Sequence, residues 1–205
     1  MPIPTRPRSF DRVRCAGLIV GPITFISAWL AAGAVTKGYS PMRDYISDLD
    51  AVAAPTRPLM NVGFTTFALA VGLAAGPLRS RLGAPTAAAM SANALLSVGI
   101  MVAPLGKSRA GDRVHGVVAG LGYLALAATA PSAAPTLAAR QRTLARASIA
   151  VGVTSMACLV ASLVRPEKGF WQRAGITTTD AWMVLVGILV LADHPAVMTR
   201  TLPRD

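Results

Sequence analysis

The chain is predicted to be an all-α membrane protein, an up-and-down bundle of six transmembrane helices with a short interfacial segment after the first. Two observations predict this. Hydrophobic residues make up 53% of the 205 residues and charged residues only 14%, too few for the polar faces that helices of a soluble protein need. The apolar residues also gather in six stretches, most of them about 20 residues long, which is enough to cross a hydrocarbon core. These stretches are roughly 15–35, 58–78, 84–105, 114–134, 144–164 and 176–191.

The first stretch follows a basic tail, as a secretory signal would, but it is longer than the usual signal core. We therefore expect a retained helix. The connection after it is long and polar, and Pro41 is suited to begin a short helix there. Tyr45, Asp48 and Leu49 then fall at helical spacings, which predicts an amphipathic segment on the membrane surface. The alternative is a solvated loop with internal ion pairs, such as Arg43 with Asp48.

Short connectors at 79–83 and 135–143 favour antiparallel neighbours for the second and third helices and for the fourth and fifth. Before the fourth stretch, Asp112 is predicted to be the N-cap, which places His115 in the first helical turn. The sequence Phe170-Trp171-Gln172-Arg173 precedes the sixth stretch. It is typical of an aromatic belt with a headgroup-binding arginine, or of an arginine that clamps a phosphate or carboxylate. One domain covers residues 1–205.

The net charge of +11 does not indicate a nucleic-acid partner, because the 20 Lys and Arg residues are spread over both tails and every loop. Anionic membrane lipids are the partners that such basic loops favour. With six spans, eleven of these residues lie on one side and nine on the other. The first tail, with Arg6, Arg8, Arg12 and Arg14, weighs most. We therefore expect both termini in the cytoplasm and the protein in a bacterial inner membrane, since 17 Arg against 3 Lys is typical of a GC-rich bacterial genome.

Metal and cofactor sites are not expected. His115 and His194 form no His-x-x-x-His pattern and lie at opposite sides of the predicted bundle, which disfavours both a zinc site and paired haem ligands. Cys15 and Cys158 belong to no metal-type cluster and are read as small buried residues.

Polar residues gather in the first, third and fifth connections, which all emerge on the predicted outer side. Asp180, about one turn inside the sixth stretch, is a candidate because a carboxylate within lipid is usually functional or paired with another helix. Asp112 and His115 could perform acid–base chemistry, or serve only as a cap and a satisfied histidine. The catalytic candidates are His115, Asp180 and Asp112. The binding candidates are Tyr39, Ser40, Arg43, Tyr45, Ser47, Asp48, Asn61, Arg113, Gln172 and Arg173.

Three tracts, GYSPMRDYISDLDA at 38–51, GDRVHG at 111–116 and GFWQRAG at 169–175, resemble the bacterial and archaeal membrane family called domain of unknown function 998. The resemblance covers essentially the whole chain. It implies a six-helix integral membrane protein and supplies no established activity, substrate or cofactor. The positions that match are Tyr39, Ser40, Tyr45, Ser47, Asp48, Asp112, His115, Gln172 and Arg173.

Three functions stay open at this point. The first is a protein that binds a lipid headgroup or small anion in an outward-facing polar cavity through Arg43, Arg113 and Arg173. The second is a small intramembrane enzyme that acts on a lipid or prenyl substrate at the outer leaflet, with His115 or Asp180 as general base. The third is an accessory subunit that packs its small-residue helices against a membrane protein partner.

Overall fold

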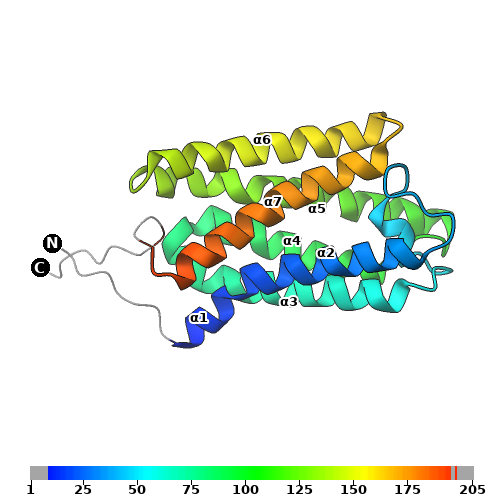
Figure 1. Ribbon diagram of the computed structural model, residues 1–205, viewed down its shortest axis with the longest axis horizontal. Helices are drawn as coiled ribbons and strands as arrows, with labels where there is room; N and C mark the ends of the chain where they lie inside the picture. Colours follow the sequence, from blue (N-terminus) through cyan, green and yellow to red (C-terminus); the bar gives the residue numbers. More distant parts are fainter. Residues whose placement is uncertain (1–8, 195–196, 198–205) are drawn as a thin grey trace, which may run out of the picture.

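The computed structural model describes residues 9–194 and residue 197, which form helices joined by connections of unequal length (Figure 1). Six helical stretches within this part of the chain are long and apolar enough to cross a membrane, the first of them Phe10–Val35. The predicted six-helix membrane bundle is therefore confirmed. The elements in chain order are α1 (Ser9–Cys15), α2 (Gly17–Val35), the 3₁₀ helix η1 (Ile46–Asp50), α3 (Arg57–Leu82), α4 (Ala84–Val102), α5 (Arg109–Ala138), α6 (Arg142–Val164) and α7 (Lys168–Leu191).

The helices run up and down, and each packs against its neighbour in sequence. The ring closes because α7 returns beside α2, while α5 contacts both α7 and α3. Figure 1 shows the connections 36–56, 103–108 and 165–167 together at one end of the bundle, which we call the loop end. The opposite end carries α1 and the end of α7.

Helix ends differ from the hydropathic boundaries. The last helix begins at Lys168 rather than near residue 176, and α5 begins at Arg109 rather than at residue 114. A helix continues wherever its backbone hydrogen bonds and packing allow, so its polar first turns escape a hydropathy criterion. Arg12 likewise belongs to α1 rather than to a tail, and its Nη1 lies 2.9 Å from Asp193 Oδ2. Arg6 and Arg8 of the first tail and Arg200 and Arg204 of the last tail, which were counted among the eleven basic residues of one side, lie outside the described residues.

Local chemistry explains the tight turns. A single residue, Gly83, separates α3 from α4 with φ of +97°, in the left-handed region that favours glycine. Pro85 follows in the first turn of α4, where its missing N–H costs nothing. At the start of α5, the Ser108 side chain accepts a hydrogen bond from the Gly111 amide at 3.0 Å. Ser108 is therefore the N-cap, and the assignment of Asp112 to that position was wrong.

The buried core is built from small and aliphatic side chains with a few aromatic rings. Phe25 of α2 packs on Phe64 and Phe67 of α3, with ring centroids 4.8 and 5.7 Å apart. The outer surface of the bundle is also apolar: Leu95 is 72% exposed and Leu163 is 70% exposed. An apolar core within an apolar exterior is the pattern expected of a bundle surrounded by lipid.

Candidate functional site

The connection between α2 and α3 folds back onto the loop end, where η1 contacts α2, α3 and α7. Its 3₁₀ helix η1 buries the side chains of Ile46 and Leu49. The Asp48 carboxylate accepts a hydrogen bond from the Tyr45 amide at 2.8 Å, which holds the start of η1. The segment is amphipathic as expected, since Ile46 and Leu49 pack into the core cluster while Asp48 is exposed. Its place at the membrane surface stays a prediction.

Arg173 of α7 anchors this connection. Its Nη1 donates to the carbonyl oxygens of Pro41, Asp44 and Gly169 at 2.9, 3.0 and 2.9 Å. Its Nη2 donates to the Tyr39 hydroxyl. Only 8% of the surface of Arg173 is exposed, and both terminal nitrogens donate to the chain itself, while the buried Nε has no partner among the described residues. A planar guanidinium suits this task, because it presents several N–H groups in one rigid fork.

Aromatic rings and a close backbone contact complete the anchor. The Arg173 guanidinium carbon lies 5.1 Å from the ring centroid of Trp29 and 5.5 Å from that of Tyr39, which is cation–π range. Gly169 allows the connection to approach α7, since a Cβ atom there would lie 2.3 Å from the Asp44 oxygen. Burial raises the pKa of Tyr39, an effect that Arg173 opposes.

A second set of hydrogen bonds ties η1 to α5 and α6. Gln172 Oε1 accepts from the Ile46 amide at 2.8 Å, and Gln172 Nε2 donates to the Tyr123 hydroxyl. The Tyr45 hydroxyl donates to the Ser162 carbonyl at 2.8 Å. Gln172 and Arg173, adjacent on α7, therefore hold different parts of the same connection.

His115 lies in the second turn of α5 and is 4% exposed. Its Nδ1 lies 2.8 Å from the Ala103 carbonyl oxygen. A carbonyl only accepts, so Nδ1 carries the proton, and Nε2 of the neutral ring is left as an acceptor. Nε2 is buried and has no hydrogen-bond partner among the described residues. Asp112 does not hold the imidazole; its Oδ1 accepts from the Gly106 amide at 2.8 Å.

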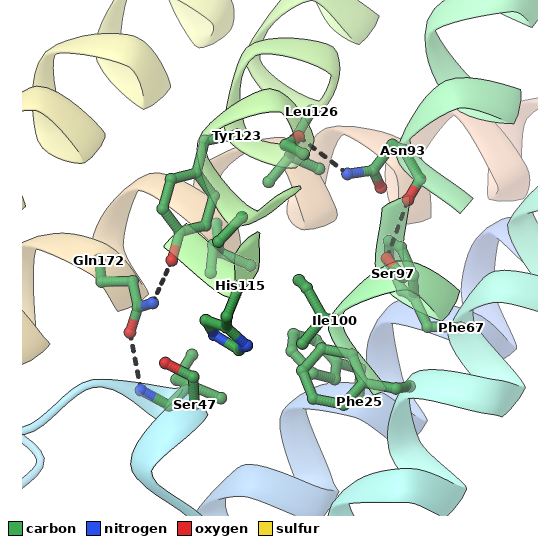
Figure 2. Close-up of a pocket in the computed structure, with 15 residues that line it drawn as sticks. Phe25, Ser47, Phe67, Asn93, Ser97, Ile100, His115, Tyr123, Leu126 and Gln172 are labelled. Atoms are coloured by element: carbon green, nitrogen blue, oxygen red, sulfur yellow. Dashed lines mark hydrogen bonds between the residues drawn. The ribbon is translucent and has the colours of Figure 1, made fainter. Parts of the chain in front are cut away.

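His115 borders an inner cavity of about 50 Å³ near the loop end (Figure 2). Figure 2 shows polar side chains at two edges of this cavity, Gln172 and Tyr123 at one and Asn93 and Ser97 at another. Asn93 Nδ2 donates to the Gly122 carbonyl at 3.1 Å, while its buried Oδ1 has no partner among the described residues. The other walls are mainly apolar. They include Phe25, Ile46, Phe64, Phe67, Ile100, Leu126 and Ile176.

A larger lateral groove of about 570 Å³ adjoins the inner cavity between α5 and α6. Ser47, His115, Ala119 and Tyr123 line both spaces. Polar residues gather at the loop end of the groove, and the remainder is apolar. The polar residues are Tyr45, Ser47, Asp112, His115 and Tyr123; the apolar walls include Val117, Leu121, Leu124, Leu159, Val160 and Leu163.

The groove opens on the lipid-facing side of the bundle. Val117, Leu121 and Val160 on its walls are 62%, 50% and 51% exposed. Gly116 and Gly120 lie along α5, and a Cβ atom added to either would meet nothing within 4 Å. The groove therefore exists because two glycines of α5 leave room beside α6.

The structure brings together only part of the predicted site. Tyr45, Ser47, Asp112, His115 and Gln172 line one or both of these spaces. Tyr39, Ser40, Asp48 and Arg173 instead form hydrogen bonds within or to the connection between α2 and α3. Arg43, Arg113, Asn61 and Asp180 line neither space.

Asp180 is separate from the cavity although it is fully buried in α7. Neither of its carboxyl oxygens has a hydrogen-bond partner among the described residues. Because Asp180 lines neither the inner cavity nor the groove, the structure does not bring it together with His115 at either space. Arg43 and Arg113 are exposed at the loop end. Among the described residues, no Lys or Arg lines either space.

Two contributors were missed from the sequence. Tyr123 borders both spaces, and Asn93 borders the inner cavity. The sequence feature that could have identified both residues is a hydroxyl or amide side chain within an apolar span, since such a side chain usually faces other helices. Asp50 was also missed: it is 1% exposed, and burial raises its pKa to about 6 against the effect of Arg57, whose Nε is 4.0 Å away.

Comparison with known families agrees with the architecture. The family described as "Protein of unknown function (DUF998)" matches residues 19–189, from α2 to the last turn of α7. The match includes η1, His115, Gln172 and Arg173, and so the whole loop-end arrangement described above. No curated protein and no solved structure matches the chain. Because the match covers far more than half of the sequence, the chain belongs to the DUF998 family of membrane proteins.

Proposed function

We propose that this protein binds a membrane lipid in the lateral groove between α5 and α6. The observation that carries the proposal is the groove's polarity. Hydroxyl, imidazole and carboxyl groups lie at the loop end, and apolar residues line the rest. A lipid has the same division between head and chain. Most ligand sites are likewise largely apolar with a few placed polar groups.

The location of the groove supports the same proposal. Its walls belong to membrane-spanning helices and continue into the exposed apolar surface. A ligand could thus enter from the bilayer without passing through water. We further propose that the loop end faces the outside of a bacterial inner membrane, so that the lipid head lies at the outer leaflet.

A small anion is a weaker candidate than a lipid. The three arginines first considered for an anion site lie outside the groove, and Arg173 donates to backbone carbonyls. Anion sites usually present Arg, Lys or several backbone N–H groups to the ligand. The groove instead presents an aspartate and neutral groups.

Lipid binding is tested by filling the groove. The full-length protein is reconstituted in phosphatidylcholine vesicles that contain a photoactivatable lipid with a diazirine on its chain. Gly120→Leu places a side chain where a Cβ meets nothing within 4 Å. We expect wild-type crosslinks on α5 and α6 at the groove and at least tenfold less crosslinking there in Gly120→Leu. Ala128→Leu places the same side chain at an exposed position of α5 outside the groove and serves as the control. Equal crosslinking in all three proteins would refute the proposal.

Catalysis on the bound lipid is a second candidate, favoured by one observation. His115 has a buried Nε2 without a partner, and its Nδ1 is held by the Ala103 carbonyl. A general base needs this orientation, with one nitrogen fixed and the other directed to the substrate. The check is mass spectrometry of vesicle lipids incubated with wild type and with His115→Gln. A lipid product formed only by wild type would establish an enzyme. Identical lipid profiles would mean that the protein binds the lipid without changing it.

A further inference from the structure

The inner cavity is bounded by hydrogen-bond acceptors that lack donors. One is His115 Nε2, which is unprotonated in the neutral ring because Nδ1 donates to the Ala103 carbonyl. The other is Asn93 Oδ1, whose partner nitrogen already donates to the Gly122 carbonyl. Both acceptor atoms are buried and have no partner among the described residues. An unsatisfied buried acceptor destabilises a fold, so this cavity favours a group that brings an N–H or O–H.

The remaining polar groups at the cavity are neutral. The side-chain oxygen of Gln172 accepts a hydrogen bond from the Ile46 amide, and its side-chain nitrogen donates one to the Tyr123 hydroxyl. The Ser97 hydroxyl donates to the Asn93 carbonyl at 2.9 Å. No described cation lines the cavity or the groove; the Lys168 ammonium lies 4.5 Å from the Tyr45 ring, outside both. A carboxylate or phosphate brings no donor for His115 Nε2 or Asn93 Oδ1. An alcohol supplies that donor, and its oxygen can accept from the Ser47 or Tyr123 hydroxyl, which also line the cavity.

Size gives a further restriction. The inner cavity, at about 50 Å³, is far smaller than the adjoining groove, at about 570 Å³. A hydroxyl, or a hydroxyl with a water, fits the inner cavity. The groove that adjoins the cavity at His115 has room for a chain.

We infer that the lipid bound in the groove is a long-chain alcohol whose hydroxyl enters the inner cavity and donates a hydrogen bond to His115 Nε2 or Asn93 Oδ1. This inference rests on the proposed function, since it names the class of lipid that the groove holds. It assigns selectivity to the cavity and chain binding to the groove.

The test compares three chains that differ only in the head. Full-length protein in phosphatidylcholine vesicles is crosslinked with a hexadecanol carrying a chain diazirine, in competition with hexadecanol, methyl hexadecyl ether or hexadecanoate. The ether keeps an oxygen but has no donor. We expect hexadecanol to compete at about five- to tenfold lower concentration than the ether, which corresponds to one hydrogen bond. We expect hexadecanoate to be the weakest of the three.

Two variants locate the selectivity. His115→Phe removes one of the two acceptors and keeps a ring. Equal potency of hexadecanol and the ether in this variant would assign the hydroxyl to His115 Nε2, whereas a preference that persists would assign it to Asn93 Oδ1. Arg43→Gln, exposed and outside both spaces, should leave the difference unchanged. If His115→Phe fails to fold, the comparison of hexadecanol and the ether on wild type still tests whether the site prefers an alcohol.

Each contrary result has a distinct meaning. Equal potency of alcohol and ether on wild type, or stronger competition by hexadecanoate, overturns the inference. If Gly120→Leu still weakens all three chains in that case, the groove remains a lipid site and only the alcohol is wrong. If no chain competes and Gly120→Leu changes nothing, the inference and the proposed function both fail.

Discussion

At the loop end, one side chain carries several structural tasks. Arg173 donates to three carbonyl oxygens and to the Tyr39 hydroxyl while lying near two aromatic rings. Buried charges are tolerated only when such partners surround them. The residue therefore holds the connection between α2 and α3 against α7, and with it the η1 residues that border the inner cavity.

Replacing Arg173 tests this role. Arg173→Lys keeps the charge but cannot present a planar fork to three carbonyls. We expect it to destabilise the folded protein by about 2–4 kcal/mol, seen as a lower melting temperature in detergent and as faster hydrogen exchange at the Ile46 amide. Arg43→Lys, on an exposed residue of the same connection, is the control and should leave both unchanged. An unaltered exchange rate in Arg173→Lys would contradict the anchoring role.

Asp50 gives a pH dependence whose sign can be worked out. Burial raises its pKa from 3.8 to about 6 in the folded protein. A carboxyl whose pKa is raised on folding stabilises the fold below its unfolded pKa, and this contribution is lost as the pH rises through about 6. The loss is at most about 3 kcal/mol. The melting temperature, measured between pH 4.5 and 7.5, should therefore fall more steeply with rising pH for wild type than for Asp50→Asn. Parallel curves would show that Asp50 does not titrate in this range.

At the scale of elements, glycines have opposite roles at two helix surfaces. At Gly169 of α7, a Cβ atom would approach the Asp44 and Pro41 oxygens to 2.3 and 2.6 Å. At Gly116 of α5, a Cβ atom would meet nothing within 4 Å. The first glycine permits close contact between a helix and a connection. The second widens a groove between helices.

This contrast predicts opposite effects for the same substitution. Gly169→Ala should destabilise the protein by about 1–3 kcal/mol, because backbone atoms must move apart. Gly116→Ala should be neutral or should stabilise α5 by about 0.5–1 kcal/mol, since alanine is the better helix former. The melting temperatures of both variants in one detergent provide the measurement. Similar decreases in melting temperature for both variants would mean that the close backbone contact is not the reason for a glycine at position 169.

At the scale of the whole molecule, three connections meet at the loop end, and the two ends of the described chain lie at the other. This arrangement follows from an even number of antiparallel spans and holds whichever way the bundle is inserted. The orientation in the membrane is a separate property, which we predict from the basic first tail.

Cysteine labelling measures that orientation. In a background with Cys15→Ala and Cys158→Ala, Lys107→Cys places a thiol at the loop end and Arg79→Cys one at the opposite end; both positions are exposed. A membrane-impermeant maleimide added to intact cells should label only Lys107→Cys, and Arg79→Cys should react after permeabilisation. The reverse pattern would place the loop end in the cytoplasm.

Much of the fold was predictable because lipid leaves few solutions. A chain in a bilayer must satisfy its backbone within each span, so apolar stretches of sufficient length become helices. The short connectors then make neighbours antiparallel. What hydropathy could not find was the start of α7, because Gly169, Gln172 and Arg173 are polar or small and still helical. Their helical backbone depends on contacts with a distant connection.

The sequence by itself determined the membrane environment, the six spans and the gathering of loop-end polar residues on one side. Only the tertiary structure decided which of them share a cavity. His115, Gln172 and Tyr123 meet there, whereas Arg173 turns to backbone carbonyls and Asp180 lies apart. The physical reason is that hydropathy reports where along the bilayer normal a residue lies. The rotation of each helix, and the return of η1 into the bundle, depend on packing between segments far apart in the chain.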